Sequence, residues 1–497
     1  MGRLALGVDT EFFEPLELEE HQHHKSQYVL GLSGTGKSVL LGNMAVQYHR
    51  MGEGVLVIDT KDGLLCEEIA ARYDSEDVIY VAPGLCYWDG QPHYWGLNIF
   101  ELKHADPDRK DLTFSDMIGT AMALFERMGS LESIMTQVEE HLEMGIRLAV
   151  CKKGSTLIDL DKILTDPAWR RDIIANYTVP PKLVEDWRNF DAAFKTANAQ
   201  AKEIKSTLPR VHRLTQPHEI QNMVSQYETT LKIGEWLDQG KMVLCNFGKN
   251  IPQPYKVDIG NLVMALAVSE GFRRRRVEED DKRHWRFIID EFHQLASRQF
   301  AELIDLGRSK RIWPVMAHQN REQLKNFREQ NNQLSTSVTG AGVQILLSLG
   351  DEDRKHFRDV LSKDRSERIE ALEQYQAVVS ITGGPADSGF PMTVLLDNWW
   401  AERDEARLQR LIDAQKPFTQ PKRLVEENNR KRYYPAPENG TKNGNATADT
   451  EKDPPEPSGT QSQGGDTPAG ADRTRDRDAA AARQGPFRHK RPGRDDV

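Results

Sequence analysis

The sequence predicts an α/β protein with a mainly parallel sheet, an all-helical segment that interrupts it, and a disordered C-terminal tail. Apolar strand-like runs alternate with helical patterns in residues 24–100 and again in 241–396, which is typical of a parallel sheet covered on both faces. Residues 106–227 carry few strand signals and many helix formers, and residues beyond about 435 have hardly any aliphatic side chain. The expected parts are 1–105, 106–227, 228–416 and a linker with tail at 417–497.

The composition is that of a soluble globular protein large enough for two or three domains. Of its 497 residues, 38% are hydrophobic and 29% are charged. No apolar run approaches the ~20 residues needed to cross a bilayer, and residues 1–20 are acidic, unlike a secretory signal. We therefore expect a cytoplasmic protein without a transmembrane segment. The net charge of −10 argues against general coating by nucleic acid, but a local basic channel stays possible.

Neither the cysteines nor the histidines predict a metal site. The four cysteines have no CxxC spacing, so we expect reduced, mostly buried thiols at Cys66, Cys86, Cys151 and Cys245. Three histidines precede the first strand of the nucleotide-binding region, but no second ligand cluster accompanies them. We expect surface positions for His21, His23 and His24.

Residues Gly31–Ser38 form a phosphate-binding motif between the apolar run Gln27–Leu30 and a helical pattern. Its glycines let the backbone approach phosphates closely, and successive N–H groups at a helix N-terminus point toward them. Lys37 adds a positive charge, and we expect the Ser38 hydroxyl on Mg²⁺. The motif predicts a nucleoside triphosphate site whose contacts are Gly31, Ser33, Gly34, Thr35, Gly36, Lys37, Ser38 and Val39.

A second apolar run, Phe287–Ile289, ends in Asp290 and Glu291. A phosphate-binding loop needs a carboxylate to hold the metal and, in hydrolases, a second carboxylate to activate water. We expect Asp290 to order Mg²⁺ and Glu291 to face the γ-phosphate. The alternative is a strand that ends in acidic turn residues, and the presence of the loop favours the nucleotide site.

Two further candidates lie between residues 306 and 319. The run Ile312–Ala317 is followed by His318 and then Gln319, where an amide can contact both the γ-phosphate and the attacking water. Arg308 belongs to a basic turn that precedes the same run. Its guanidinium could stabilise charge on the γ-phosphate of a neighbouring subunit. The alternative for Arg308 is a solvated helix end that complements the helix dipole.

Together these motifs resemble those of the HerA–FtsK superfamily of ring-forming, DNA-pumping ATPases, and within it the conjugative coupling proteins of type IV secretion. The resemblance covers about residues 24–400 and is carried by Gly31–Ser38, Ile289–Phe292, Gly307–Arg308 and Ala317–Gln319. In that branch an all-helical domain interrupts the nucleotide-binding core, as residues 106–227 are expected to do here.

The resemblance implies a RecA-like core that binds ATP and Mg²⁺ and hydrolyses ATP between the subunits of a ring. It assigns phosphate and metal binding to Lys37 and Ser38, Mg²⁺ ordering to Asp290, water polarisation to Glu291, γ-phosphate sensing to Gln319 and a finger in trans to Arg308. A finger in trans requires a neighbour, and a closed homohexamer satisfies every interface. The resemblance therefore favours the catalytic interpretation of Arg308.

The implied function is ATP-driven DNA translocation, as a coupling protein or a HerA-like pump. A ring that threads polypeptide and a nucleotide switch that acts through the helical segment are alternatives, because the same site serves both. Coupling proteins usually begin with membrane helices, and no membrane-like segment precedes the loop here. We expect a soluble member that reaches a secretion channel, a nuclease or a relaxase through protein contacts.

Two arginine-rich segments are candidates for contact with DNA or a partner. Residues Phe272–Arg276 end a helical pattern and could face a DNA backbone. The acidic run Glu278–Asp281 follows them, so an exposed, self-neutralised loop is the alternative. The patch Phe487–Pro492 in the tail could recruit a partner or be a solvated end.

Overall fold

The computed structural model describes most of the chain up to residue 434. The described residues are 2–434 without 11–12, 102–114, 116, 123, 126–135, 254, 275–282, 296–303, 305–306, 326–337, 339, 361–367, 382–389 and 394–401. The predicted tail, including the patch Phe487–Pro492, lies outside these residues. Within the first of two compact units, Met1–Ala436, the described elements form an α/β core and a group of helices.

The core is built on an eleven-stranded sheet among the described residues, in the order β2-β1-β13-β12-β11-β3-β10-β9-β4-β8-β5. The run from β11 to β5 is parallel throughout, while β12, β13, β1 and β2 extend it with antiparallel pairs. The parallel strands are β3 (Gln27–Leu30), β4 (Gly54–Asp59), β5 (Val78–Val81), β8 (Met242–Asn246), β9 (Trp285–Ile289), β10 (Ile312–His318) and β11 (Val343–Leu346). The antiparallel strands are β1 (Leu4–Asp9), β2 (Pro15–Leu18), β12 (Gln376–Ile381) and β13 (Phe390–Thr393). The predicted mainly parallel sheet is confirmed.

Alternating side chains of the central strands fill two hydrophobic cores, one on each face of the sheet. On β4, Val55 and Val57 pack with helices α2 (Lys37–Arg50) and α3 (Leu64–Arg72), whereas Leu56 and Ile58 belong to the opposite core. That opposite core includes α12 (Ile233–Asp238) and α13 (Tyr255–Arg273). Full burial of each such side chain stabilises the fold by roughly 1.5–3 kcal/mol. Burial on both faces explains why these strands are continuous apolar runs.

Pro314 lies inside β10, where a proline would remove a hydrogen bond of a central strand. The structure shows how the strand accommodates it. Pro314 is opposite Phe287 of β9, but β3 begins to pair with β10 only at Val315. Pro314 therefore lies just before the part of β10 that is paired on both sides.

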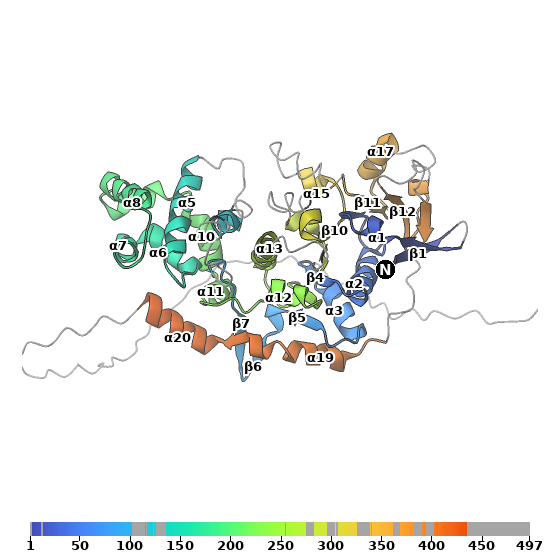
Figure 1. The fold of residues 1–497 in the computed structure, drawn as a ribbon, viewed down its shortest axis with the longest axis horizontal. Coiled ribbons are helices and arrows are strands. Elements are labelled where there is room, and N and C mark those ends of the chain that lie inside the picture. The colour runs from blue at the N-terminus through green and yellow to red at the C-terminus, as the bar shows by residue number, and fades with distance from the viewer. Residues whose placement is uncertain are drawn as a thin grey trace, which may run out of the picture. The chain divides into compact units, whose positions relative to one another are not determined.

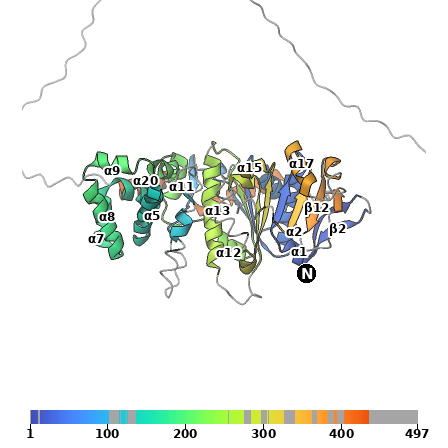
Figure 2. The same cartoon turned by 90° about the horizontal axis from the view of Figure 1, so that it is seen from above.

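Between β7 (Gln91–Trp95), which pairs with β6 (Tyr87–Trp88), and β8, the regular elements in the described part of the chain are α-helices. They are α5 (Thr136–Cys151), α6 (Leu157–Thr165), α7 (Pro167–Asn176), α8 (Pro181–Ala193), α9 (Ala197–Glu203), α10 (Leu208–Thr215), α11 (His218–Val224) and α12. Figures 1 and 2 show α5, α7 and α8 away from the strands, so the helices do not cover the sheet evenly. In α5, buried Leu142, Ile146 and Ala149 recur at helical spacing. No described helix is long and apolar enough to cross a membrane.

The segment expected to be a linker from residue 417 is structured as far as residue 434. It follows α19 (Glu405–Asp413) and forms η5 (Lys416–Phe418), β14 (Thr419–Pro421) and α20 (Lys422–Tyr433). β14 pairs with β7, and Phe418 stacks on Trp95 with ring centroids 5.7 Å apart. The expectation for residues 417–434 is thus corrected: tertiary contacts, not local apolar periodicity, order this segment.

Residues 403–434, which we call the C-terminal strap, contact both the core and the helices. Near its start, Gln415 accepts hydrogen bonds from Ala82 N (2.7 Å) and Trp95 Nε1 (3.3 Å). Near its end, the Tyr433 hydroxyl bonds Thr156 Oγ1 (2.7 Å) and Asp159 Oδ2 (2.9 Å), both buried in the helical segment. Figure 1 shows α19 and α20 following one another along one edge of the molecule.

Candidate active site

The phosphate-binding loop lies at the carboxyl end of β3. β3 ends at Leu30 and α2 begins at Lys37, so residues 31–36 make the turn between them. Gly34 and Gly36 adopt positive φ angles of 79° and 110°, which side chains disfavour. Gly36 is also the N-cap of α2 and supplies no side-chain hydrogen bond to the first turn. The amides of that turn therefore remain available to an anionic ligand.

Lys37 is buried at the start of α2, and its ammonium group lies over the loop. Nζ donates to the carbonyl oxygens of Gly31 (2.6 Å) and Leu32 (2.9 Å). Burial lowers the pKa of Lys37, while the carboxylates of Asp290 and Glu291 act in the opposite direction. The lysine is thus placed between the loop and the two acidic residues that follow β9. Ser38 is exposed beside it.

Asp290 and Glu291 follow β9, which lies between β10 and β4 in the sheet. Both side chains are buried. The pKa of Asp290 is raised to about 7 because its carboxyl is buried and faces the negative charges of Asp59 and Glu291, while Lys37 opposes the shift. Such a carboxylate cluster at the carboxyl edge of parallel strands is a suitable environment for a divalent cation.

Glu291 contacts the side chain that follows β10. Gln319 Nε2 donates to Glu291 Oε1 at 2.6 Å, and Lys61 Nζ lies 3.7 Å from the same oxygen. Glu291 has a φ of 50°, an uncommon left-handed conformation for a residue with a side chain. Its Oε2 is buried without a hydrogen bond in the described structure and lies 3.5 Å from His293 Nδ1. The predicted carboxylate and amide are therefore brought together.

The loop and the amide lie on neighbouring strands. β10 is parallel to β3, and Gly31 N donates to the carbonyl oxygen of His318 at 3.3 Å. His318 is fully buried with Nε2 2.8 Å from the Tyr28 hydroxyl, and burial lowers its pKa to about 3. A neutral imidazole thus holds the end of β10 against β3, which places Gln319 beside the loop.

Sequence reasoning missed Asp59 and Lys61. Asp59 ends β4, is buried, and accepts from the backbone N–H groups of Lys61 (3.0 Å) and Leu65 (3.1 Å). Burial raises its pKa, and its charge also raises that of Asp290. The available signal was the run Val55–Ile58 ending in Asp59, because parallel strands present their carboxyl ends at one edge. Lys61 reaches Glu291 from that edge.

Arg308 lies at the opposite edge of the sheet. Residues 307–310 are helical and precede the amino end of β10, whereas Gln319 follows its carboxyl end. The seven residues of β10 separate the two by roughly 20 Å at about 3.3 Å per residue. Arg308 is exposed. The structure therefore does not bring Arg308 to the loop of its own subunit.

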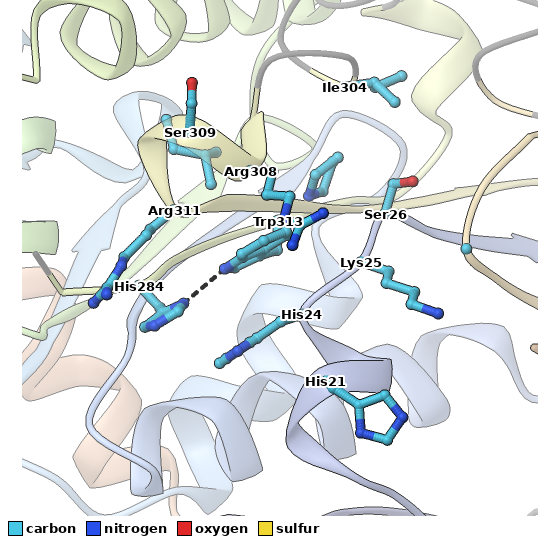
Figure 3. A pocket seen from close by; sticks show the side chains of 13 residues that line it. His21, His24, Lys25, Ser26, His284, Ile304, Arg308, Ser309, Arg311 and Trp313 are labelled. Carbon is cyan, nitrogen blue, oxygen red and sulfur yellow. Dashed lines mark hydrogen bonds between the residues drawn. The ribbon is translucent and has the colours of Figure 1, made fainter. Parts of the chain in front are cut away.

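Arg308 lines a cavity of about 610 Å³ at this amino edge, together with Lys25, Arg311 and an aromatic group. In that group the rings of His24 and His284 stack at 4.0 Å, and Trp313 Nε1 donates to His284 Nδ1 at 2.8 Å. Figure 3 shows Arg308 above Trp313, with the imidazoles of His24 and His284 below it. The cavity thus combines basic side chains with flat rings.

The histidines before β3 are not all surface residues. His21 is exposed, as expected, but His24 is half-buried and His23 is buried. Ligand atoms of His23, His24 and Glu53 lie within 4.8 Å of one another. Glu53 is already bound by the guanidinium of fully buried Arg286, with Nε and Nη2 contacts of 3.0 and 3.1 Å. Because Arg286 already binds the Glu53 carboxylate, these three residues are a poor site for a metal cation.

Arg274 of the arginine cluster is packed inside the protein, and all four cysteines lie among the described residues. Arg274 is buried, donates to the carbonyl of Lys310 and to Asp238, and stacks over Trp285 at 4.1 Å. It is therefore a packing residue and does not face a DNA backbone, whereas residues 275–276 lie outside the described residues.

All four cysteines are free, and three of them are buried, as predicted.

One family model matches the part of the chain that contains three of the predicted site residues. Residues 284–377, which contain Asp290, Glu291 and Gln319, match a family model described as the TraM recognition site of TraD and TraG. No curated protein matches the sequence significantly.

Solved structures share the fold over about four fifths of this chain. The unbound conjugative coupling protein TrwBdeltaN70 superposes with a TM-score of 0.54 at 15% identity, covering 80% of this chain and 92% of that one. TrwB in complex with ADP and Mg²⁺ gives 0.53 at 16% identity, covering 78% and 90%. VirB4 of Thermoanaerobacter pseudethanolicus gives 0.52 at 12% identity, covering 82% and 98%.

The chain thus has the fold of the conjugative coupling protein TrwB and of VirB4, and residues 284–377 match the family model of TraD and TraG. The predicted resemblance to conjugative coupling proteins is confirmed. At these identities the structural likeness concerns the fold, and the roles of individual residues stay predictions.

Proposed function

We propose that this chain is an ATP-driven ring motor that moves DNA during conjugative transfer, with hydrolysis at the interfaces between subunits. The observation that carries the proposal is the contact between Glu291 and Gln319 beside the phosphate-binding loop. It joins a carboxylate suited to activating water with an amide suited to sensing the γ-phosphate. A loop that only bound nucleotide would not need this pair.

In the proposed site the loop amides and Lys37 hold the triphosphate. The Lys37 ammonium would exchange its contacts with Gly31 O and Leu32 O for phosphate oxygens. Both sets of partners are acceptors, so the exchange leaves no donor unsatisfied. TrwB in complex with ADP and Mg²⁺ and with non-hydrolysable ATP and GTP analogues supports nucleotide binding by this fold.

The residues at this edge also fit Mg²⁺, which prefers oxygen ligands. Ser38 offers an exposed hydroxyl, and Asp290 offers a carboxylate whose pKa is raised by burial and by the nearby charges of Asp59 and Glu291. When bound, the ion would neutralise charge on the β- and γ-phosphates. A cation near Asp290 would favour the ionised carboxylate and so lower the pKa of Asp290 again.

Glu291 and Gln319 would act on the attacking water. Gln319 occupies Glu291 Oε1, so Oε2 is the oxygen left to accept a proton from water as its oxygen bonds the γ-phosphorus. The bond from phosphorus to the β–γ bridging oxygen breaks, and ADP leaves with that oxygen. Gln319, held by the carboxylate, is positioned to respond to the presence of the γ-phosphate.

The position of Arg308 supports the proposal that catalysis takes place at the interface between subunits. It lies at the amino edge of the sheet while the loop lies at the carboxyl edge, so only the loop of another subunit is open to it. Head-to-tail packing that joins these two edges forms a ring if it closes. We propose a homohexamer in which Arg308 stabilises the transition-state charge of the neighbour.

DNA and conjugation proteins are the proposed partners. The matched model names a TraM recognition site, which supports contact with a relaxosome component, and a secretion channel would receive the DNA. We propose that the chain works in the cytoplasm. The DNA-contacting surface does not include Arg274, which is buried.

ATP turnover by the purified chain, with and without DNA, tests the proposal. We expect turnover that rises several-fold when DNA is added and that disappears in Glu291→Gln. Turnover that unfolded polypeptide stimulates and DNA does not would favour a protein-remodelling ring. Turnover that neither polymer affects would favour a nucleotide switch, and no turnover in the parent chain would contradict an ATPase.

A further inference from the structure

A short segment that sequence analysis passed over lies against the phosphate-binding loop. Residues 373–376 form a turn closed by a hydrogen bond from Gln376 N to Glu373 O at 3.2 Å. From this turn, Gln374 Nε2 donates to Gly34 O (2.8 Å) and Tyr375 N donates to Thr35 O (3.0 Å). Two consecutive residues therefore bind two consecutive carbonyls of the loop.

The topology explains why a segment so distant in sequence reaches the loop. The turn immediately precedes β12, which runs antiparallel to β11, and β11 is parallel to β3. The amino end of β12 therefore lies at the same edge of the sheet as the carboxyl end of β3. In the sheet order, β11 and β12 lie on one side of β3, while β10 and β9 lie on the other.

This strand order predicts how a bound nucleotide would be oriented. Glu291 and Gln319, the partners expected for the γ-phosphate, follow β9 and β10. A triphosphate that points its γ-phosphate toward them extends its nucleoside away from them, toward the β11 and β12 side of the loop. Tyr375 is an aromatic residue that contacts the loop on that side.

The Tyr375 side chain is held in an unusual way. Its φ is 66°, a left-handed conformation that a bulky side chain rarely adopts and that persists where the surroundings impose it. Its ring is so close to Gly36 that a Cβ added there would lie 2.6 Å from Tyr375 Cδ1. Yet 37% of the residue is exposed, so the ring is anchored to the loop without being buried.

We propose that Tyr375 provides the ring on which the base of the bound nucleotide stacks. The inference rests on the proposed nucleotide site and adds the part of it that recognises the nucleoside. One exposed aromatic face suits any purine, because stacking uses the π-face that adenine and guanine share. The competing interpretation is a clasp that only fixes the shape of the loop through Gln374 and the Tyr375 backbone.

Two ligands separate these interpretations. In the presence of Mg²⁺, ATP offers both the triphosphate and the base, whereas inorganic triphosphate offers only the former. The informative variant is Tyr375→Asn, because asparagine tolerates the left-handed conformation and lacks the ring. Tyr375→Phe is the matched control that keeps the ring, and Gln374→Ala removes one bond to the loop and leaves the ring in place.

Calorimetric titration of the full chain with each ligand gives the result. We expect Tyr375→Asn to weaken ATP binding about tenfold while its affinity for inorganic triphosphate and its melting temperature stay at the parental values. Tyr375→Phe should bind both ligands as the parent does. Gln374→Ala should change the two affinities in parallel, if at all, because it acts on the loop.

Two outcomes would overturn the inference while leaving the nucleotide site intact. In one, Tyr375→Asn binds ATP as tightly as the parent. In the other, it loses ATP and inorganic triphosphate to the same extent, which is the behaviour of a clasp. A parent chain that binds neither ligand would instead refute the nucleotide site, and the inference would fall with it.

Discussion

At Glu291 several local features coincide. The carboxylate is buried, its backbone has a φ of 50°, and Gln319 donates to one of its oxygens at 2.6 Å. A left-handed conformation at a residue other than glycine persists only where the surroundings enforce it, and such residues gather at functional sites. Glu291 lies two residues after Ile289, the last residue of β9. The backbone turns at Glu291 and directs its carboxylate to Gln319.

Lys37 and Glu291 should separate nucleotide binding from hydrolysis. We expect Lys37→Ala to abolish detectable ATP binding, because it removes the charge that neutralises the phosphates. Glu291→Gln should bind ATP with parental affinity and hydrolyse it at least about 100-fold more slowly, the usual effect of losing a general base. Single-turnover rates and ATP titration measure the two effects. Parental hydrolysis by Glu291→Gln would refute the assigned role.

The buried ion pair between Glu53 and Arg286 should stabilise the fold. Removing only the arginine, in Arg286→Met, leaves a buried carboxylate without its partner and should cost roughly 3–5 kcal/mol of unfolding free energy. The double variant Glu53→Gln with Arg286→Met should recover much of this loss. Urea denaturation measures both, and equal stability of the single and double variants would contradict the pairing.

The same pair predicts part of the acid sensitivity. Burial alone would raise the pKa of Glu53, but the guanidinium of Arg286 outweighs it and lowers the pKa from 4.5 to about 2. Because the folded-state pKa is depressed, the stabilisation is complete above about pH 4.5 and is lost as the pH falls toward 2, by up to roughly 3 kcal/mol. The double variant should lose less stability than the parent between pH 5 and 3. An unchanged pH dependence would contradict this.

At the scale of elements, periodicity predicted the strands that are buried on both faces. The runs at β3, β9 and β10 were located from sequence to within a residue or two, because continuous apolar runs identify central parallel strands. The antiparallel β1 and β2 were missed. They are short, and β1 depends on β13, which is remote in sequence.

Those active-site residues that belong to a local sequence motif could be predicted. The loop and the Asp290–Glu291 pair have fixed local patterns, whereas Tyr375 enters through tertiary contacts alone. Tyr375 reaches Gly36 across more than three hundred residues of sequence. Only the pairing of β11 with β3 and with β12 brings it there. Composition and spacing contain no signal for such a contact.

The C-terminal strap should contribute to stability, unlike the residues beyond it. Ending the chain after Tyr434 removes only residues outside the described structure and should leave the melting temperature and basal ATP hydrolysis unchanged. Ending it after Glu402 also removes the buried side chains of Leu408, Val425 and Tyr433. Each should cost roughly 1.5–3 kcal/mol, so we expect a melting temperature lower by several degrees. Equal melting temperatures of the two truncated chains would contradict the role of the strap.

For the whole molecule, the separation of Arg308 from the loop has the largest consequence. The seven residues of β10 lie between Arg308 and Gln319. A single subunit therefore holds the loop and both carboxylates at one edge of its sheet, and an exposed arginine beside a basic cavity at the other. Assembly that joins unlike edges would complete the site in every subunit of a closed ring.

Subunit mixing tests this account most directly. Arg308→Ala and Glu291→Gln are each expected to be inactive alone. In mixed rings, an Arg308→Ala subunit keeps its own site and can receive Arg308 from a Glu291→Gln neighbour, so random mixing in equal amounts should restore roughly a quarter of the interfaces.

A subunit that carries both substitutions, mixed with Glu291→Gln, is the control and should stay inactive. Recovery of ATP turnover only in the first mixture is the predicted result. No recovery in rings shown to contain both subunits, or full activity of Arg308→Ala alone, would contradict hydrolysis between subunits.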